Sequence, residues 1–183
     1  DFFRLSDMAV KLENRVCVVT GAARSIGLAI AERYAGEGAK VALLDINPAV
    51  KQEAARLAAS GRTTVGYVVD ITDREAVLAC FADIVKSLGS VYCLVNNAGL
   101  VDQRPFEQIT PEQMDRMMRV NVHGTLYCVQ AAVPGMRSLK DGRIINFSSK
   151  SGKTGSALMA HYSAAKGAII ALTQALAFEL AEA

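Results

Sequence analysis

The sequence predicts an α/β protein in which a doubly wound parallel sheet lies between two layers of helices. Strand-like runs of consecutive apolar residues alternate with segments of helical period along the chain. Such runs are typical of strands buried on both faces, which occur in parallel sheets covered by helices. In addition, a glycine-containing turn follows the first strand, and folds of this class bind phosphate groups at that point.

Five strands and their connecting helices are expected in order. The strands are predicted at 16–20, 40–44, 64–69, 91–95 and 143–147. The pair Thr72 and Glu75 has the spacing of a capping box, which predicts the start of the third helix. The helices are predicted at 26–37, 48–61, 72–88, 110–137 and from about 160 to the end. Because no linker or repeat interrupts this pattern, residues 8–183 are expected to form one domain, with residues 1–7 as an extension or residues added upstream.

Composition excludes several classes of protein. The chain has 183 residues, of which 51% are hydrophobic and 21% charged, so it is globular. Twenty basic and eighteen acidic residues give a net charge of +2, which is too balanced to indicate nucleic acid or a membrane as partner. No run of 18 apolar residues predicts a membrane span, and residues 1–7 do not resemble a signal peptide.

The four cysteines predict neither a metal site nor disulfides. Their spacings of 63, 13 and 35 residues contain no Cys-x-x-Cys or Cys/His metal pattern. Cys17 and Cys93 lie inside apolar strand-like runs, so we expect buried free thiols. A cytoplasmic protein follows from this expectation. The other two cysteines are Cys80 and Cys128.

The first strand leads into a turn that predicts a dinucleotide site. In the segment 20–27, Thr-Gly-Ala-Ala-Arg-Ser-Ile-Gly, backbone N–H groups and the helix dipole can bind a pyrophosphate. Asp45 ends the second strand, where a carboxylate can accept hydrogen bonds from the ribose hydroxyls and repel a 2′-phosphate. Arg24 favours NADP, since a guanidinium can pair with that phosphate. We weigh Asp45 more heavily and expect NAD, with Asp70 as an acceptor for the adenine amino group.

Tyr162 and Lys166 lie four residues apart, so on a helix they share one face. An ammonium held beside a phenol favours the phenolate, which makes the phenol able to exchange a proton. Ser149, thirteen residues before the tyrosine, can hold a carbonyl or alcohol oxygen. Together these groups suit the reversible oxidation of an alcohol, provided that a hydride acceptor binds nearby.

With these motifs, the sequence resembles the short-chain dehydrogenase/reductase family over nearly all of residues 8–183. Gly21 and Gly27 match the family's cofactor turn, whereas Ser25 stands at its middle glycine. The run 96–99, Asn-Asn-Ala-Gly, matches the family's segment after the fourth strand. The resemblance implies a Rossmann-like three-layer α/β/α fold. Cofactor contacts are expected from Gly21, Arg24, Ser25, Ile26, Gly27, Asp45, Asp70, Ile71, Asn97, Ala98, Gly99, Tyr162 and Lys166.

The family's catalytic tetrad maps onto Asn121, Ser149, Tyr162 and Lys166. Tyr162 is expected to act as general acid in reduction and general base in oxidation, with Ser149 holding the substrate oxygen. The resemblance implies that Lys166 binds the nicotinamide ribose and that Asn121 supports a water chain leading to Lys166. The chain would thus transfer a hydride between NAD(H) and a small alcohol or ketone. Two alternatives stay open: an NADPH-dependent 3-oxoacyl thioester reductase, and a cofactor-binding subunit without turnover.

The last helix is almost wholly apolar from Gly167 to Ala181, which predicts burial on more than one side. Its second side is expected to meet another subunit of a dimer or tetramer, or further residues of the same chain. The resemblance implies more strands after residue 183, so we expect the functional protein to be longer. Of the two histidines, His161 is expected to be solvated or at a pocket rim, and neither it nor His123 is assigned a role.

Overall fold

The computed structural model describes residues 12–181, which form a five-stranded parallel sheet. The strand order is β3-β2-β1-β4-β5, and every adjacent pair is parallel. The predicted fold class and all five predicted strands are confirmed. The assigned bounds are β1 Val16–Thr20, β2 Lys40–Asp45, β3 Thr64–Val68, β4 Val91–Asn96 and β5 Arg143–Asn146. The expectation for residues 1–7 lies outside the described residues.

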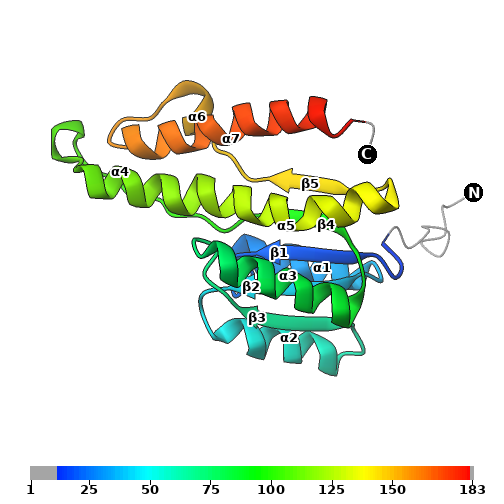
Figure 1. Cartoon of the computed structure of the whole chain (residues 1–183). Helices are drawn as coiled ribbons and strands as arrows, with labels where there is room; N and C mark the ends of the chain where they lie inside the picture. The colour runs from blue at the N-terminus through cyan, green and yellow to red at the C-terminus, as the bar shows by residue number, and fades with distance from the viewer. Residues whose placement is uncertain (1–11, 182–183) are drawn as a thin grey trace, which may run out of the picture.

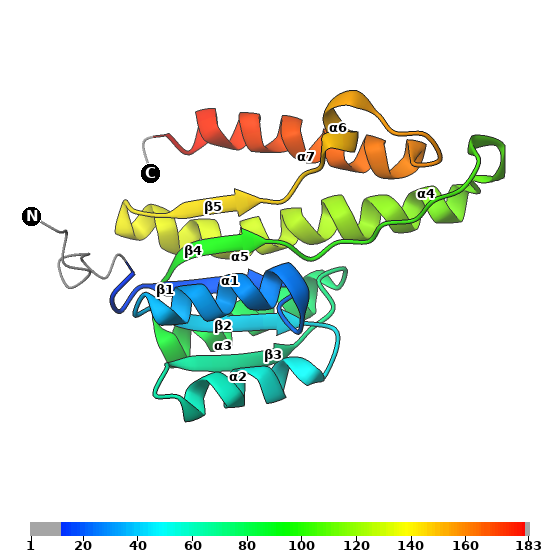
Figure 2. The same cartoon turned by 180° about the vertical axis from the view of Figure 1, so that it is seen from behind.

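Helices cover both faces of the sheet. Figure 1 shows α3 and α5 over one face, and Figure 2 shows α1 and α2 over the other. In both views α7 runs beside β5, at the edge of the sheet. The helices are α1 Ser25–Gly36, α2 Ala49–Ala59, α3 Arg74–Leu88, α4 Pro111–Met118, α5 Gly124–Leu139, α6 Lys150–Thr154 and α7 Ala160–Glu179, with a π-helical turn at Arg119–His123.

The core lies on both sides of the sheet because successive strand residues point to opposite faces. Along β1, Cys17 and Val19 pack in the cluster under α1 and α2. Val16 and Val18 pack in the cluster under α3 and α5. Burial on both faces explains why β1 is a continuous apolar run rather than an alternating one.

Two predicted helix features are corrected. The capping residue of α3 is Asp73 and not Thr72, since the Asp73 carboxylate accepts the N–H of Ala76 at 3.0 Å. The predicted helix from Thr110 to Arg137 is continuous in direction but contains the π-helical turn at 119–123. Its predicted start is confirmed, because Thr110 and Gln113 form a complete capping box.

The last helix is less buried in this chain than its composition predicted. Its buried residues all lie in its first half: His161, Ala165, Lys166 and Ile169. Beyond them Phe178 is 88% exposed. In this half Leu176 packs against the core cluster under α3 and α5, whereas Phe178 faces solvent, and burial of that exposed apolar surface by another subunit or by further chain stays a prediction.

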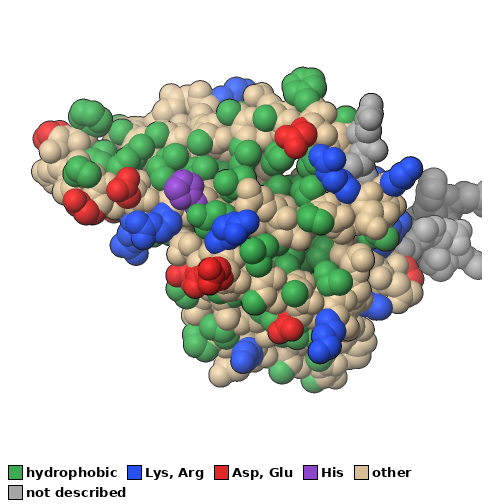
Figure 3. All heavy atoms as spheres, viewed as in Figure 1, with side chains coloured by type: hydrophobic (Ala, Val, Ile, Leu, Met, Phe, Trp, Pro, Cys, Tyr) green, Lys and Arg blue, Asp and Glu red, His purple; other side chains and the backbone are tan. Residues whose placement is uncertain are grey.

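Surface charge is mixed on the face shown in Figure 3, where acidic and basic side chains lie interspersed. Within residues 12–181, no helix combines the length and the apolar character that crossing a membrane requires.

Candidate active site

A groove of about 670 Å³ opens at the carboxyl ends of four strands. Its walls come from the segments that follow β1, β2, β3 and β4. The sheet order reverses between β1 and β4, and in doubly wound sheets ligands bind at the crevice formed there. Ten of the residues predicted to contact a cofactor line this groove: Gly21, Arg24, Ser25, Ile26, Asp45, Asp70, Ile71, Asn97, Ala98 and Gly99.

Two glycines of the turn after β1 allow the backbones of β1, α1 and β4 to meet. Gly21 has φ +65°, and a Cβ there would lie 2.9 Å from Ala98 Cα. Gly27 is buried beneath the groove, and a Cβ there would lie 2.1 Å from the Gly21 carbonyl oxygen. Larger residues at either position would push the turn away from β4, which is the physical reason for glycine in this motif.

Ser25 has φ 52°, in the left-handed region that glycine adopts most easily. It stands where the family pattern has its middle glycine. The turn therefore keeps its glycine-like shape although it carries a side chain, and the serine lines the groove.

Asp45 and Asp70 line the groove with carboxylates that already hold backbone groups. Asp45 accepts the N–H of Ala23 at 3.0 Å with one oxygen and that of Asn47 at 2.9 Å with the other. Asp70 accepts the N–H of Thr72 at 2.8 Å. A carboxylate has about four acceptor positions, so each can still accept from a ligand.

The two asparagines at the end of β4, Asn96 and Asn97, join the central strands. The Asn97 side chain donates to the carbonyls of Thr20 at 3.0 Å and Gly21 at 3.2 Å. Asn96 donates to the Asn146 side chain at 2.9 Å, which links β4 to β5. These bonds fix the groove wall against the glycine turn.

Asn121 lies in the π-helical turn and is 1% exposed. Its amide donates to the carbonyls of Leu100 at 2.9 Å and Met117 at 3.1 Å, and its oxygen accepts the N–H of Leu100 at 3.3 Å. The side-chain amide thus pairs with both the N–H and the carbonyl of Leu100, as the backbone of a neighbouring strand would. The widened turn brings this amide to the end of the groove.

Lys166 lies one turn after Tyr162 on α7, with its ammonium 5.9 Å from the tyrosine ring centroid. The ammonium donates to the Phe147 carbonyl at 2.8 Å. Burial lowers the pKa of Lys166 below its ordinary value of 10.5. A Cβ built on Gly99 would lie 3.4 Å from this nitrogen and 2.9 Å from the Asn121 side-chain oxygen. Lys166 and Asn121 therefore converge on the same end of the groove.

Ser149 is held against α7 by its neighbours. Ser148 donates to the Lys166 carbonyl at 2.7 Å, and a Cβ on Gly152 would lie 2.5 Å from the Lys166 carbonyl carbon. The Ser149 hydroxyl oxygen accepts the N–H of Ser151 at 3.2 Å. Its own proton thus remains available for a substrate oxygen.

The expectation for His161 was wrong: it is 2% exposed, because it lies in the first turn of α7 beneath the segment after β4. The sequence interpretation also missed seven groove residues. Ile46, Val69, Thr72 and Leu100 are immediate neighbours of predicted residues, so extending each motif by one residue would have found them. Val120 likewise directly precedes the predicted Asn121. The other two, Arg116 and Arg119, reach the groove through the packing of the helix, for which the sequence carries no local signal.

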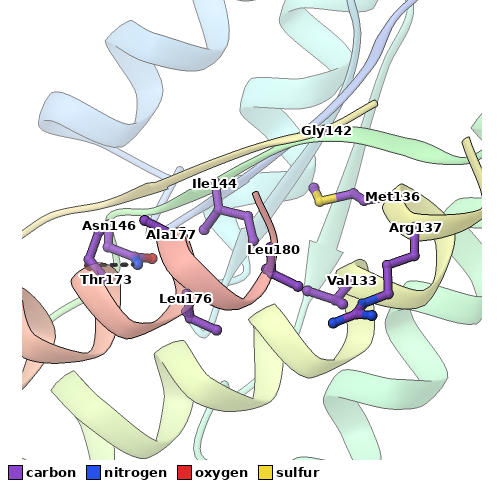
Figure 4. Close-up of a pocket in the computed structure, with 10 residues that line it drawn as sticks. All are labelled: Val133, Met136, Arg137, Gly142, Ile144, Asn146, Thr173, Leu176, Ala177 and Leu180. Atoms are coloured by element: carbon purple, nitrogen blue, oxygen red, sulfur yellow. Dashed lines mark hydrogen bonds between the residues drawn. The ribbon is translucent and has the colours of Figure 1, made fainter. Parts of the chain in front are cut away.

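A second cavity, of about 190 Å³, lies between α5, β5 and α7 (Figure 4). Leu176 and Leu180 of α7 and Val133 of α5 line it, and Asn146 bonds to Thr173 at 3.0 Å at one end. It shares no lining residue with the groove, and the four predicted catalytic residues line neither cavity. It is therefore separate from the candidate active site.

The fold and the groove define a doubly wound protein with a nucleotide-type crevice, and Lys166 and Asn121 approach one end of it at Gly99. The chain matches the short chain dehydrogenase family over residues 15–183. It belongs to that family.

Three known proteins illustrate this relationship. A sorbitol dehydrogenase of Cereibacter sphaeroides is 41% identical over 174 residues, which cover 93% of this chain and 66% of the relative. The 2-(S)-hydroxypropyl-CoM dehydrogenase 3 of Xanthobacter autotrophicus is 39% identical, with 93% and 67% covered. A crystal structure of NAD⁺-bound xylitol dehydrogenase superposes with a TM-score of 0.90 at 38% identity, with 93% and 66% covered. The chain thus spans about two thirds of the length of these relatives.

Proposed function

We propose that the protein transfers a hydride between NAD(H) and a small alcohol or ketone. The observation that carries the proposal is the convergence of Lys166 and Asn121 on Gly99, at one end of a groove that begins at the glycine turn. This arrangement supports a reaction at the end of a bound dinucleotide.

The residues of the groove fit a nicotinamide dinucleotide, which supplies the hydride chemistry when bound. A crevice of about 670 Å³ falls within the ordinary range for cofactor sites. The glycine turn exposes the start of α1, where the helix dipole favours a pyrophosphate. Asp45 would accept from the adenosine ribose, Asp70 from the adenine amino group, and Lys166 would hold the other ribose.

The chain's own residues would manage the proton. In reduction, the Tyr162 hydroxyl gives its proton to the carbonyl oxygen while Ser149 donates a hydrogen bond to the same oxygen. Lys166 uses one of its three N–H donors on the Phe147 carbonyl, so two remain for the nicotinamide ribose and the Tyr162 phenol. Its burial makes loss of a proton easier, which suits a relay toward Asn121.

Polyhydric alcohols are the substrates that the comparisons favour, since two of the three similar proteins act on sorbitol and xylitol. The reaction would oxidise one secondary alcohol of such a polyol to a ketone. A thioester reductase remains the second candidate. Initial rates on a panel of polyols and 3-oxoacyl thioesters decide between them.

Replacing Tyr162 with phenylalanine tests the proposal. The variant keeps the ring but loses the proton donor, so we expect kcat to fall by about 10³-fold or more while NADH binding, followed by fluorescence, stays within about twofold. Tyr127→Phe, on α5, serves as the matched control. Full activity in the Tyr162 variant contradicts the mechanism. Tight NADH binding without turnover of any panel member by the parent supports a non-catalytic subunit instead.

The preference for NAD is proposed on Asp45, whose carboxylate opposes a 2′-phosphate. We expect kcat/KM with NAD to exceed that with NADP, and Asp45→Ser to reduce the ratio at least tenfold. A preference for NADP in the parent would assign the phosphate to Arg24.

A homo-oligomeric assembly and a cytoplasmic location are also proposed. The apolar second half of α7 fits an interface in a homodimer or homotetramer, which sedimentation tests directly. The four cysteines are free and buried, as expected, and burial raises the pKa of Cys80 and of Cys128 to about 12. Unpaired, protonated thiols are typical of cytoplasmic proteins.

A further inference from the structure

The imidazole of His161 is a buried polar group with its hydrogen bonds unmade. Its side chain is 1% exposed, and neither ring nitrogen has a hydrogen-bond partner among residues 12–181. A buried polar group without a partner costs about 1–3 kcal/mol. A histidine in the turn that carries Tyr162 therefore needs a physical reason to be there.

One charged group close to His161 is Asp102, whose carboxylate oxygen lies 3.6 Å from His161 Nε2. That oxygen already accepts from Arg104 at 3.0 and 2.8 Å, and the other oxygen accepts the Gln103 N–H at 2.9 Å. The carboxylate is thus fixed in place, and its pKa is lowered mainly by Arg104. A movement of about 0.6 Å by the imidazole completes an N–H to carboxylate hydrogen bond.

The same segment holds the start of α7 at a second point. The backbone N–H of Arg104 donates to the Leu158 carbonyl at 2.8 Å. Leu158 has φ 62°, a conformation that costs a residue other than glycine about 1 kcal/mol. The segment 102–104 therefore holds the turn before α7 in a strained shape and faces the first turn of the helix itself.

We infer that Asp102 and His161 form a positioning pair that sets where α7 places the Tyr162 phenol. His161 directly precedes Tyr162, so any shift of the first turn moves the phenol relative to Ser149. Neither residue touches the reacting atoms, and both act through the backbone of α7. Misplacement of a reacting group by about 1 Å can cost about 10²-fold in rate.

The inference rests on the proposed function, and a double-mutant cycle tests it. His161→Leu and Asp102→Ala each remove the contact, so we expect kcat to fall about tenfold in each while NADH affinity stays within about twofold. The double variant should lose no more than either single variant. His161→Gln, whose amide can replace Nε2, should recover to within about threefold of the parent. Glu107→Ala, an exposed acid of the same loop, is the control and should match the parent.

Multiplicative losses of about 100-fold in the double variant would overturn the inference, as would equal losses in the Gln and Leu variants. Amide hydrogen exchange across residues 158–163 gives a readout independent of turnover. We expect equally faster exchange in His161→Leu and Asp102→Ala and parental exchange in His161→Gln. If the parent turns over no substrate, the proposed function fails, and the exchange pattern alone decides whether the pair positions the helix.

Discussion

The two halves of the candidate site are built in different ways. The half made by β1 to β4 rests on a sheet whose two central strands are buried except at Tyr92. Its loops are fixed by the Asn97 amide, which donates to Thr20, and by the Asp45 carboxylate, which accepts from Ala23. The half made by β5, α6 and α7 rests on a partly exposed strand and on close contacts around Lys166. The comparison teaches that binding and proton transfer depend on separate structural supports. Substitutions should therefore affect them separately.

Gly27→Ala should have the largest effect. Its Cβ would lie 2.1 Å from the Gly21 carbonyl oxygen and 2.6 Å from the side-chain nitrogen of Asn97, which is itself hydrogen-bonded to the turn, so there is little room for relaxation. We expect the free energy of unfolding to fall by about 3 kcal/mol and NADH binding to be lost. Urea denaturation and fluorescence titration measure these, with Gly135→Ala as control because a Cβ there meets open space. Unchanged NADH affinity would refute the role of the turn.

Gly152→Ala should damage the other half of the site. The added methyl would lie 2.5 Å from the Lys166 carbonyl carbon, so α6 must move away from α7 and take Ser149 with it. We expect kcat to fall about 100-fold while the dissociation constant for NADH changes less than threefold. Gly155→Ala tests for a general effect of alanine, although its φ of +72° adds some strain. Parallel losses of binding and turnover would show that the two halves are not separate.

The lowered pKa of Lys166 predicts that stability depends on pH. Because burial lowers the pKa of Lys166, the unfolded chain binds more protons than the folded chain at pH values between the lowered pKa and 10.5. The parent should therefore gain stability relative to Lys166→Met as pH rises through the window between the lowered pKa and 10.5. Urea denaturation of both proteins at several pH values up to 10 measures this gap. For the variant Lys153→Met, whose lysine is exposed, the difference in free energy of unfolding from the parent should not change with pH. If the difference for Lys166→Met is also independent of pH, the prediction is contradicted.

Ser25→Gly should have the smallest effect. Relief of the left-handed conformation is worth about 1 kcal/mol, and the added freedom of glycine in the unfolded chain cancels part of it. We expect the free energy of unfolding to rise by about 0.5 kcal/mol in urea denaturation. Ser25→Ala keeps the Cβ and should give no gain. If alanine stabilises as much as glycine, the backbone at residue 25 is not strained.

Much of the fold was predictable from the sequence because its signals are local. Continuous apolar runs such as Val16–Thr20 predicted buried parallel strands, and Gly21 with Asn97 marked the ends of two of them. Thr110 and Gln113 predicted a helix start through contacts within four residues. The same local logic failed at Thr72, where Asp73 competes as the capping residue and prevails.

The sequence by itself determined the succession of strands and helices along the chain, the glycine turn, and the spacing of Tyr162 and Lys166 by one helical turn. Each of these features depends on neighbours a few residues apart. Only the tertiary structure decided that Asn121 occupies a π-helical turn, that Arg116 and Arg119 reach the groove and that His161 is buried against Asp102. Those features depend on how α4 and α7 pack on loops that are distant in sequence, and no local pattern records such a contact.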